Sequence, residues 1–218
     1  MNGTSLTLGL VAGVALAGVV CQRRGSASGI DSLVSMAKVR AVYARLGPWM
    51  AAVIEAAGDD PEFSEFDPNV YSFDGGQLEA ALGVPVLGFG YSRVVVRVAP
   101  GIVAKLPWRQ DGHDRNRAEV GAWDEASEAV QQKMLPPLGS IYPGIALFPE
   151  VKVVARNSME TAKLSVKAKA ELRRAQQRWL RLVNAGAPGA ITSDVYGPEN
   201  WGRYEGRLVL IDYEPEEG

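Results

Sequence analysis

The chain has one cysteine and one histidine in 218 residues, and these shortages exclude several classes of protein. A single thiol, Cys21, cannot form an internal disulfide or a zinc cluster built on several thiolates. A Ser-His-Asp hydrolase would need His113 as its base, yet this residue lies in a polar stretch that we interpret as a solvated loop. Neither chemistry is expected here.

A surplus of basic residues is also missing. The formal net charge is −2, so the composition gives no support for a nucleic-acid partner. No glycine-rich stretch ends in Gly-Lys-Ser or Gly-Lys-Thr, which excludes a P-loop. The length leaves room for one domain with its own core and an appendage.

Charge is absent altogether from residues 1–22. Their apolar run would rise about 24 Å as a helix, against a hydrocarbon core of roughly 30 Å. No positive segment precedes the run, which argues against a secretory signal peptide. We therefore predict a transmembrane helix at residues 1–24 that enters the membrane through residues 5–22, with a buried apolar leader as the alternative. Arg23 and Arg24 follow, so the rest of the chain is expected on the cytoplasmic side.

Residues 25–83 are predicted to form a linker and a helical region. Apolar residues recur at helical spacing from about residue 31 to 57, as one helix or as two divided at Gly47-Pro48. A shorter helix from Gly76 should end at Gly83, since glycine favours helix termini.

A strand, a tight turn and a second strand are predicted over residues 84–98, with Gly88 and Gly90 at the turn. Such glycines let backbone N–H groups approach phosphate oxygens, although ordinary hairpins use the same residues. The next strand carries Lys105 between apolar neighbours, where an ammonium group is costly unless an anion meets it. A lysine that reaches water from a sheet edge is the alternative.

A helix is predicted from Asn116 to about Met134, and it offers two roles for Glu119. The side chain could point inward and pair with Lys105. The Asn-x-x-Glu spacing also fits a capping box, in which Glu119 only satisfies a backbone donor, and spacing alone favours the cap.

The C-terminal part combines a long helix, predicted over residues 161–184 with a solvated arginine face, and an acidic segment. Asp194 and Asn200 lie in a Gly/Pro loop, and Asp212 follows an apolar strand. Hard cations prefer oxygen ligands that converge from separate backbone segments, so this pattern indicates a divalent-metal and phosphate site.

In this order of glycine turn, strand lysine, helix glutamate, long helix, acidic loop and strand-end aspartate, the chain resembles the protein kinase-like superfamily. It looks closest to small, truncated kinase-like proteins of bacteriophages and bacteria, over roughly residues 84–214. The resemblance implies an α+β fold with a kinase-like N-lobe β-sheet, one αC-type helix and an abbreviated, mainly helical C-lobe, together forming a domain at residues 84–218 behind the N-terminal hydrophobic helix.

By this resemblance the ligands would be ATP and Mg²⁺. Gly88 and Gly90 would cover the phosphates, while Lys105, paired with Glu119, would contact the α- and β-phosphates.

The resemblance also implies the catalytic and metal-binding roles. Asp194 would accept the proton of the substrate hydroxyl, and Asn200 and Asp212 would bind the metal. The implied function is a membrane-tethered, ATP- and Mg²⁺-dependent phosphotransferase.

Several residues depart from the family pattern. Arg93 stands in place of the third glycine, the interval from Asp194 to Asn200 is one residue longer than usual, and Glu214 replaces a glycine. The chain ends six residues beyond Asp212, without the segment that normally docks a peptide substrate. With these departures, the phosphotransferase would act on a small-molecule substrate or use a protein partner that supplies docking. The second hypothesis is an inactive pseudokinase, and the third is a non-catalytic membrane-anchored adaptor.

Overall fold

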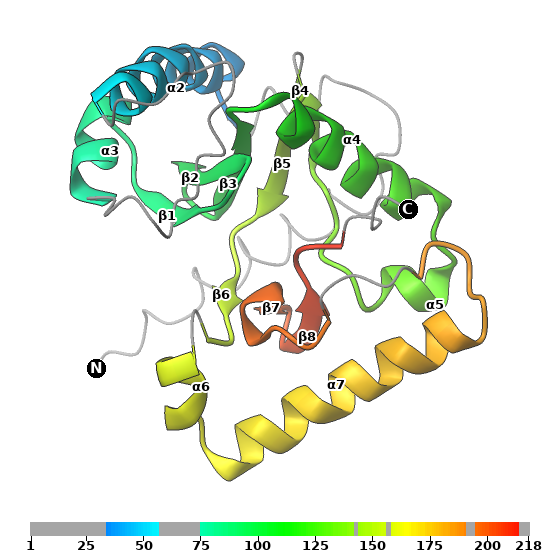
Figure 1. Cartoon of the computed structure of the whole chain (residues 1–218). Coiled ribbons are helices and arrows are strands. Elements are labelled where there is room, and N and C mark those ends of the chain that lie inside the picture. The colour runs from blue at the N-terminus through cyan, green and yellow to red at the C-terminus, as the bar shows by residue number, and fades with distance from the viewer. Residues whose placement is uncertain (1–33, 57–74, 142–143, 156–157, 191–194, 214–218) are drawn as a thin grey trace, which may run out of the picture.

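The computed structural model describes residues 34–56, 75–141, 144–155, 158–190 and 195–213. These residues form an α+β fold with six α-helices and two antiparallel sheets, which confirms the predicted class (Figure 1). The predicted membrane helix at residues 1–24 lies outside the described residues. Within them, no helix combines the length and apolar character needed to cross a membrane.

The larger sheet has five strands in the order β1-β2-β3-β5-β4. Its strands are β1 (Val86–Phe89), β2 (Arg93–Ala99), β3 (Ile102–Pro107), β4 (Gly139–Ile141) and β5 (Ile145–Pro149). Neighbours pair antiparallel throughout, and the predicted strand-turn-strand and lysine-bearing strand are confirmed as β1, β2 and β3. The site residues predicted on these strands therefore belong to one sheet.

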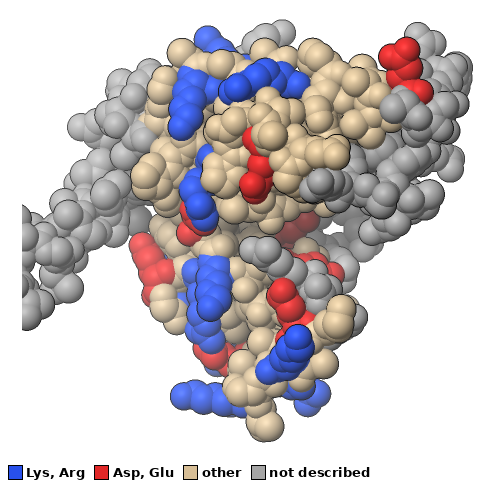
Figure 2. Space-filling model, turned by 90° about the vertical axis from the view of Figure 1, so that its left-hand side faces the viewer, with Lys and Arg blue, Asp and Glu red and all other residues tan. Residues whose placement is uncertain are grey.

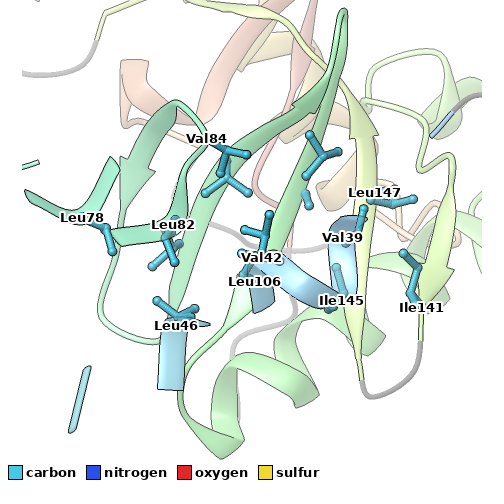
Figure 3. Packing of buried hydrophobic residues seen from close by; sticks show 14 of the residues in the cluster. Val39, Val42, Leu46, Leu78, Leu82, Val84, Leu106, Ile141, Ile145 and Leu147 are labelled. Carbon is cyan, nitrogen blue, oxygen red and sulfur yellow. The ribbon is translucent and has the colours of Figure 1, made fainter. Parts of the chain in front are cut away.

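Side chains alternate between the two faces of this sheet because successive residues of a strand point in opposite directions. On one face, Val94 pairs with Leu106, and Ala104 pairs with Leu147. These residues are fully buried in a core that includes α2 (Met36–Ala56) and α3 (Gly75–Leu82). Figure 3 shows Val39, Val42 and Leu46 of α2 and Leu78 and Leu82 of α3 beside the strands. One face is thus sealed, and polar groups are left to the other.

The two helices on the sealed face can be compared with the helices predicted from the sequence. Helix α2 runs through Gly47-Pro48 as one unit, so the division at that point does not occur. Helix α3 ends as predicted, with Gly83 in the left-handed region at φ 67°.

Helix α4 (Gln110–Glu125) starts three residues after β3 and lies against the other face of the sheet. It begins six residues earlier than predicted, and α5 (Glu128–Gln131) is a separate short helix after it. His113 therefore lies in a helix and not in a solvated loop; its Nε2 is 3.3 Å from the Tyr43 hydroxyl. The buried positions of α4 include two polar residues, Asn116 and Glu119, which directs this helix toward polar partners.

The rest of the chain lies below the large sheet in Figure 1. Its elements are β6 (Lys152–Val153), α6 (Ser158–Lys163), α7 (Val166–Asn184), the 3-10 helix η2 (Pro198–Asn200), β7 (Trp201–Tyr204) and β8 (Arg207–Leu210). The three strands form a second sheet in the order β6-β7-β8. The single helix predicted over residues 161–184 is divided, because Ser165 caps α7 by accepting a hydrogen bond from Ala168 N at 3.2 Å.

Charged side chains of both signs are exposed. On the face in Figure 2, basic and acidic residues lie near one another. This mixing agrees with the small net charge of −2 and gives that face no unbroken field of one sign.

Gly112 allows the close approach of α4 to β2 and β3. A Cβ at this position would collide with the Ser92 carbonyl oxygen and lie 3.1 Å from Pro107 Cβ, whereas a Cβ at Gly121 would meet no atom within 4 Å. We expect Gly112→Ala to lower the free energy of unfolding by about 1–3 kcal/mol. Gly121→Ala on the same helix should be neutral or stabilising by up to about 1 kcal/mol. Urea denaturation of both variants measures this, and equal effects would contradict the proposed close contact.

Candidate functional site

A cleft of about 520 Å³ opens between the α4-facing side of the large sheet and the end of β8. Most of its wall is apolar, and one end is charged. The apolar wall includes Leu87, Val95, Val103, Leu135 and Phe148. Arg93, Lys105 and Asp212 lie at the charged end. Volumes of roughly 300–1,000 Å³ with a few converging polar groups are typical of small-molecule sites.

Lys105 reaches the cleft because it occupies an odd-numbered position of β3, on the face opposite the sealed core. Its Nζ lies 2.6 and 2.7 Å from the two carboxylate oxygens of Glu119 and 3.0 Å from the Ile211 carbonyl oxygen. The same Nζ is 3.5 Å from Asp212 Oδ1 and 4.9 Å from the centre of the Phe148 ring. Lys105 is thus held in place and does not extend from a sheet edge into water.

Glu119 is fully buried and pairs with Lys105, so the capping interpretation is wrong. Because α4 begins at Gln110, Asn116 is in the helix interior and cannot be its N-cap. Asn116 instead donates from Nδ2 to the carbonyl oxygens of Lys105, at 2.9 Å, and Gly144, at 2.8 Å. The helix is thereby fastened to the strand that carries the lysine.

Arg93, the first residue of β2, joins three elements through its guanidinium group. It donates from Nη2 to Asp212 Oδ1 at 2.8 Å, and from Nη1 to Glu119 Oε1 at 3.0 Å and Asn116 Oδ1 at 3.3 Å. Only 10% of its side chain is exposed. Two cations, Arg93 and Lys105, therefore face the carboxylates of Glu119 and Asp212 at the charged end of the cleft.

Asp212 follows β8 and is fixed by the residues on both sides of it. Ile211 N donates to the Asn200 carbonyl oxygen at 2.8 Å, which brings the end of η2 beside the aspartate. The buried Tyr213 hydroxyl donates to the Leu135 carbonyl oxygen at 2.6 Å. With 39% of its side chain exposed, Asp212 can meet a ligand in the cleft, and Asn200 lines the same cleft.

The two carboxyl groups differ in acidity. Burial raises the pKa of Glu119 to about 7, against the opposing charges of Lys105 and Arg93. Burial would also raise the pKa of Asp212, but the charge of Lys105, a hydrogen bond from Glu119 and the charge of Arg93 hold that pKa well below its usual range. Asp212 is thus the ionised member, and Glu119 holds a proton more readily.

Gly88 and Gly90 both line the cleft, but their backbone groups are partly committed. Gly88 pairs with Val95 in the sheet, and Gly90 N donates to the Arg93 carbonyl oxygen at 2.9 Å. The Gly90 N–H is therefore already used within the turn, and the role of the two glycines in covering phosphates stays a prediction.

Asp194, the predicted catalytic base, lies outside the described residues. A larger hollow, of about 730 Å³, lies between α7 and β8 and is lined by exposed side chains such as Arg174, Arg178 and Arg207. The candidate site is the smaller cleft, because it is the one that joins buried charged groups with an apolar wall.

Comparison of the chain with family models, with curated proteins and with solved structures returns no match in any of the three. The cleft is therefore the feature of the chain that indicates a function.

Two residues of the site have no site role in the sequence pattern. In that pattern Arg93 is only a replacement for a glycine, and Asn116 is only a helix cap. A signal was present for Arg93, because it stands in an apolar strand two residues before Val95, the pairing partner of Lys105, and so shares a face with that lysine.

The raised pKa of Glu119 predicts a pH-dependent stability. The folded state holds this proton up to about pH 7, and the unfolded chain releases it near 4.5, so its stabilising contribution is full below pH 4.5 and is lost as pH rises through 7. The free energy of unfolding should fall by at most about 3 kcal/mol over that range relative to Glu119→Gln, which has no proton to lose. Urea titrations of both proteins from pH 4.5 to 8 provide the measurement. Parallel curves would show that Glu119 is ionised throughout.

Proposed function

We propose that this chain is a kinase-like protein that binds ATP in the cleft and transfers its terminal phosphoryl group with the help of Mg²⁺. One observation carries the proposal. A lysine on the third strand of a sheet forms a buried ion pair with a glutamate on the following helix, and both lie beside an aspartate at a strand end. A lysine and glutamate related in this way hold the phosphates of ATP in protein kinases, where an aspartate beside them binds the metal.

The cleft suits a nucleoside triphosphate chemically. Its apolar wall, formed in part by Val95, Val103 and Phe148, can accept a flat base, and the charged end offers Lys105 to the phosphates. Ammonium groups form strong, charge-assisted hydrogen bonds with phosphate oxygens. The combination of an apolar wall with the fixed ammonium group of Lys105 therefore favours ATP over an uncharged ligand.

The residues present also suit Mg²⁺. Within the described ranges no three His, Cys, Asp or Glu side chains form a metal-binding group. Asp212 and the amide of Asn200 would supply oxygen ligands, and phosphate oxygens of the nucleotide would complete the set, as is usual for Mg²⁺. When bound, the ion supplies positive charge that offsets the negative charge of the transferring phosphoryl group.

The chain's own residues have separate roles in this proposal. Lys105 orients the phosphates, Glu119 orients Lys105, and Arg93 offsets the charge of Asp212. Asp194 would accept the proton of the attacking hydroxyl. A small-molecule acceptor, or a protein partner that supplies docking, remains part of the proposal, as does a membrane tether through residues 5–22 with the cleft on the cytoplasmic side.

A second candidate function is nucleotide binding without transfer, as in a pseudokinase. The ion pair between Arg93 and Asp212 favours it, because a carboxylate already bound to a guanidinium group is a weaker metal ligand. Under this alternative the protein would respond to a nucleotide by changing its stability or its affinity for a partner.

Nucleotide binding is tested with the full-length chain and Mg-ATP. We expect a thermal shift of several degrees at ligand concentrations about a hundred times the Kd. Lys105→Met should weaken binding by about tenfold to a hundredfold, because a charge-assisted hydrogen bond to phosphate is lost. The exposed Lys167→Met on α7 is the matched control and should bind as the unaltered protein does. No shift at millimolar Mg-ATP would exclude both candidate functions.

Phosphoryl transfer is tested separately by release of ADP and labelled phosphate from ATP, with water as the acceptor. Asp194→Asn should lower this rate by about a hundredfold or more while it leaves the Kd for Mg-ATP within a few-fold, because a general base acts on the reaction and not on binding. Binding without any turnover in the unaltered protein would favour the pseudokinase. Turnover that Asp194→Asn leaves unchanged would remove Asp194 from the mechanism.

A further inference from the structure

Arg93 is a buried cation outside the set of lysine, glutamate and aspartate on which the proposed function rests. It enters the charged end of the cleft from β2 and contacts both carboxylates there, Glu119 at 3.0 Å and Asp212 at 2.8 Å. Burying a guanidinium group is costly unless anions surround it, and these two carboxylates provide that compensation. The group is therefore a fixed part of the site.

The charges around the phosphate position balance before any ion is added. Arg93 and Lys105 contribute two positive charges, and Glu119 and Asp212 carry at most two negative ones. Of the other charged groups that line the cleft, Arg115 adds positive charge, while Glu199 and Glu150 add negative charge. Glu150 is already paired with Arg97, whose Nε donates to its Oε2 at 2.6 Å.

In a site where a lone carboxylate faces a triphosphate, a divalent cation is needed to overcome their mutual repulsion. Here the guanidinium group of Arg93 already contacts the carboxylate that would repel the phosphates. The same contact uses Asp212 Oδ1, one of the two carboxylate oxygens that a metal ion could bind.

We propose that Arg93 substitutes for a divalent cation in the cleft, so that a nucleoside triphosphate binds without metal, and that Mg²⁺ is bound only when Asp212 exchanges Arg93 for the ion. The inference rests on the proposed ATP site and specifies its metal dependence. On this account Arg93 removes the requirement for a metal ion in nucleotide binding, so that the free and the metal-bound nucleotide are both taken up.

The test measures the Kd for ATP of the full-length chain by calorimetry, once with excess Mg²⁺ and once with EDTA. The two values for the unaltered protein should agree within about threefold. Arg93→Met should weaken binding in EDTA by about tenfold or more, since a unit charge near the phosphates is lost, while Mg²⁺ restores binding to within a few-fold.

Two further variants separate charge from structure. Arg93→Lys keeps the positive charge and should retain binding in EDTA, which Arg93→Met loses. Arg203→Met removes a guanidinium group of similar pairing, held by Glu171 at the surface and outside the cleft, and should change neither Kd. Thermal unfolding of each variant without nucleotide identifies any loss that comes from misfolding.

Asp212→Asn gives a result that a purely structural role for Arg93 would not. The substitution removes a negative charge beside the phosphates while Glu119 and Asn116 still hold Arg93, so binding in EDTA should tighten or stay the same, whereas Mg²⁺ should no longer add to the affinity. Weaker binding of this variant in EDTA would overturn the proposal.

The inference and the proposed function fail in different ways. A tenfold or greater loss of affinity in EDTA for the unaltered protein, with normal binding in Mg²⁺, overturns metal-independent binding and leaves the ATP site standing. Equal affinities of Arg93→Met in the two conditions also overturn it. Absence of binding in both conditions removes the ATP site, and the inference with it.

Discussion

The charged end of the cleft is held together by ion pairs among side chains that could not be buried one at a time. Lys105, Arg93 and Glu119 are almost or fully enclosed, and each is tolerable there only because the others are present. The group joins β2, β3, α4 and the segment after β8, so it links the large sheet to the lower part of the molecule. Interactions of this kind set geometry more than they add stability, because removing the charges from water offsets much of their attraction. Loss of any one member should therefore disturb the positions of the rest.

The two faces of the large sheet have different roles, and this allows the charged group to be buried. Even-numbered residues of β2 and β3 pack against α2 and α3 in an apolar core, and the odd-numbered positions Arg93, Val95, Val103 and Lys105 line the cleft. On the sealed face, the stabilisation from burying apolar side chains is proportional to the area removed from water, and these side chains need no polar partner. The open face is then free to carry Arg93 and Lys105. Helix α4 completes it with a face that is partly polar, on which Asn116 and Glu119 satisfy groups of the sheet.

Local patterns predicted β1, β2 and β3, the helix-ending Gly83, and a strand-borne lysine that needs an anion. Their success follows from short-range causes, namely alternation, turn chemistry and the cost of an unpaired charge. The contacts of Arg93 were not predictable in this way, since Glu119 and Asp212 lie 26 and 119 residues further along the chain. The role of Glu119 was decided by where α4 begins, and helix boundaries are poorly fixed by sequence. Ser165 divides the helix predicted over residues 161–184, because a side-chain cap competes locally with helix propagation.

The anchoring of Tyr213 has a consequence for how the cleft could change state. Its ring is enclosed and meets Phe148 edge to face, with centroids 6.4 Å apart, while its hydroxyl holds the loop at Leu135. The main chain on either side of Asp212 is consequently immobilised by packing and by the Ile211–Asn200 hydrogen bond. An exchange of partners at Asp212 would then proceed by rotation about its own side-chain torsions. Such rotations occur in picoseconds to nanoseconds when a side chain is exposed, far faster than rearrangements of loops.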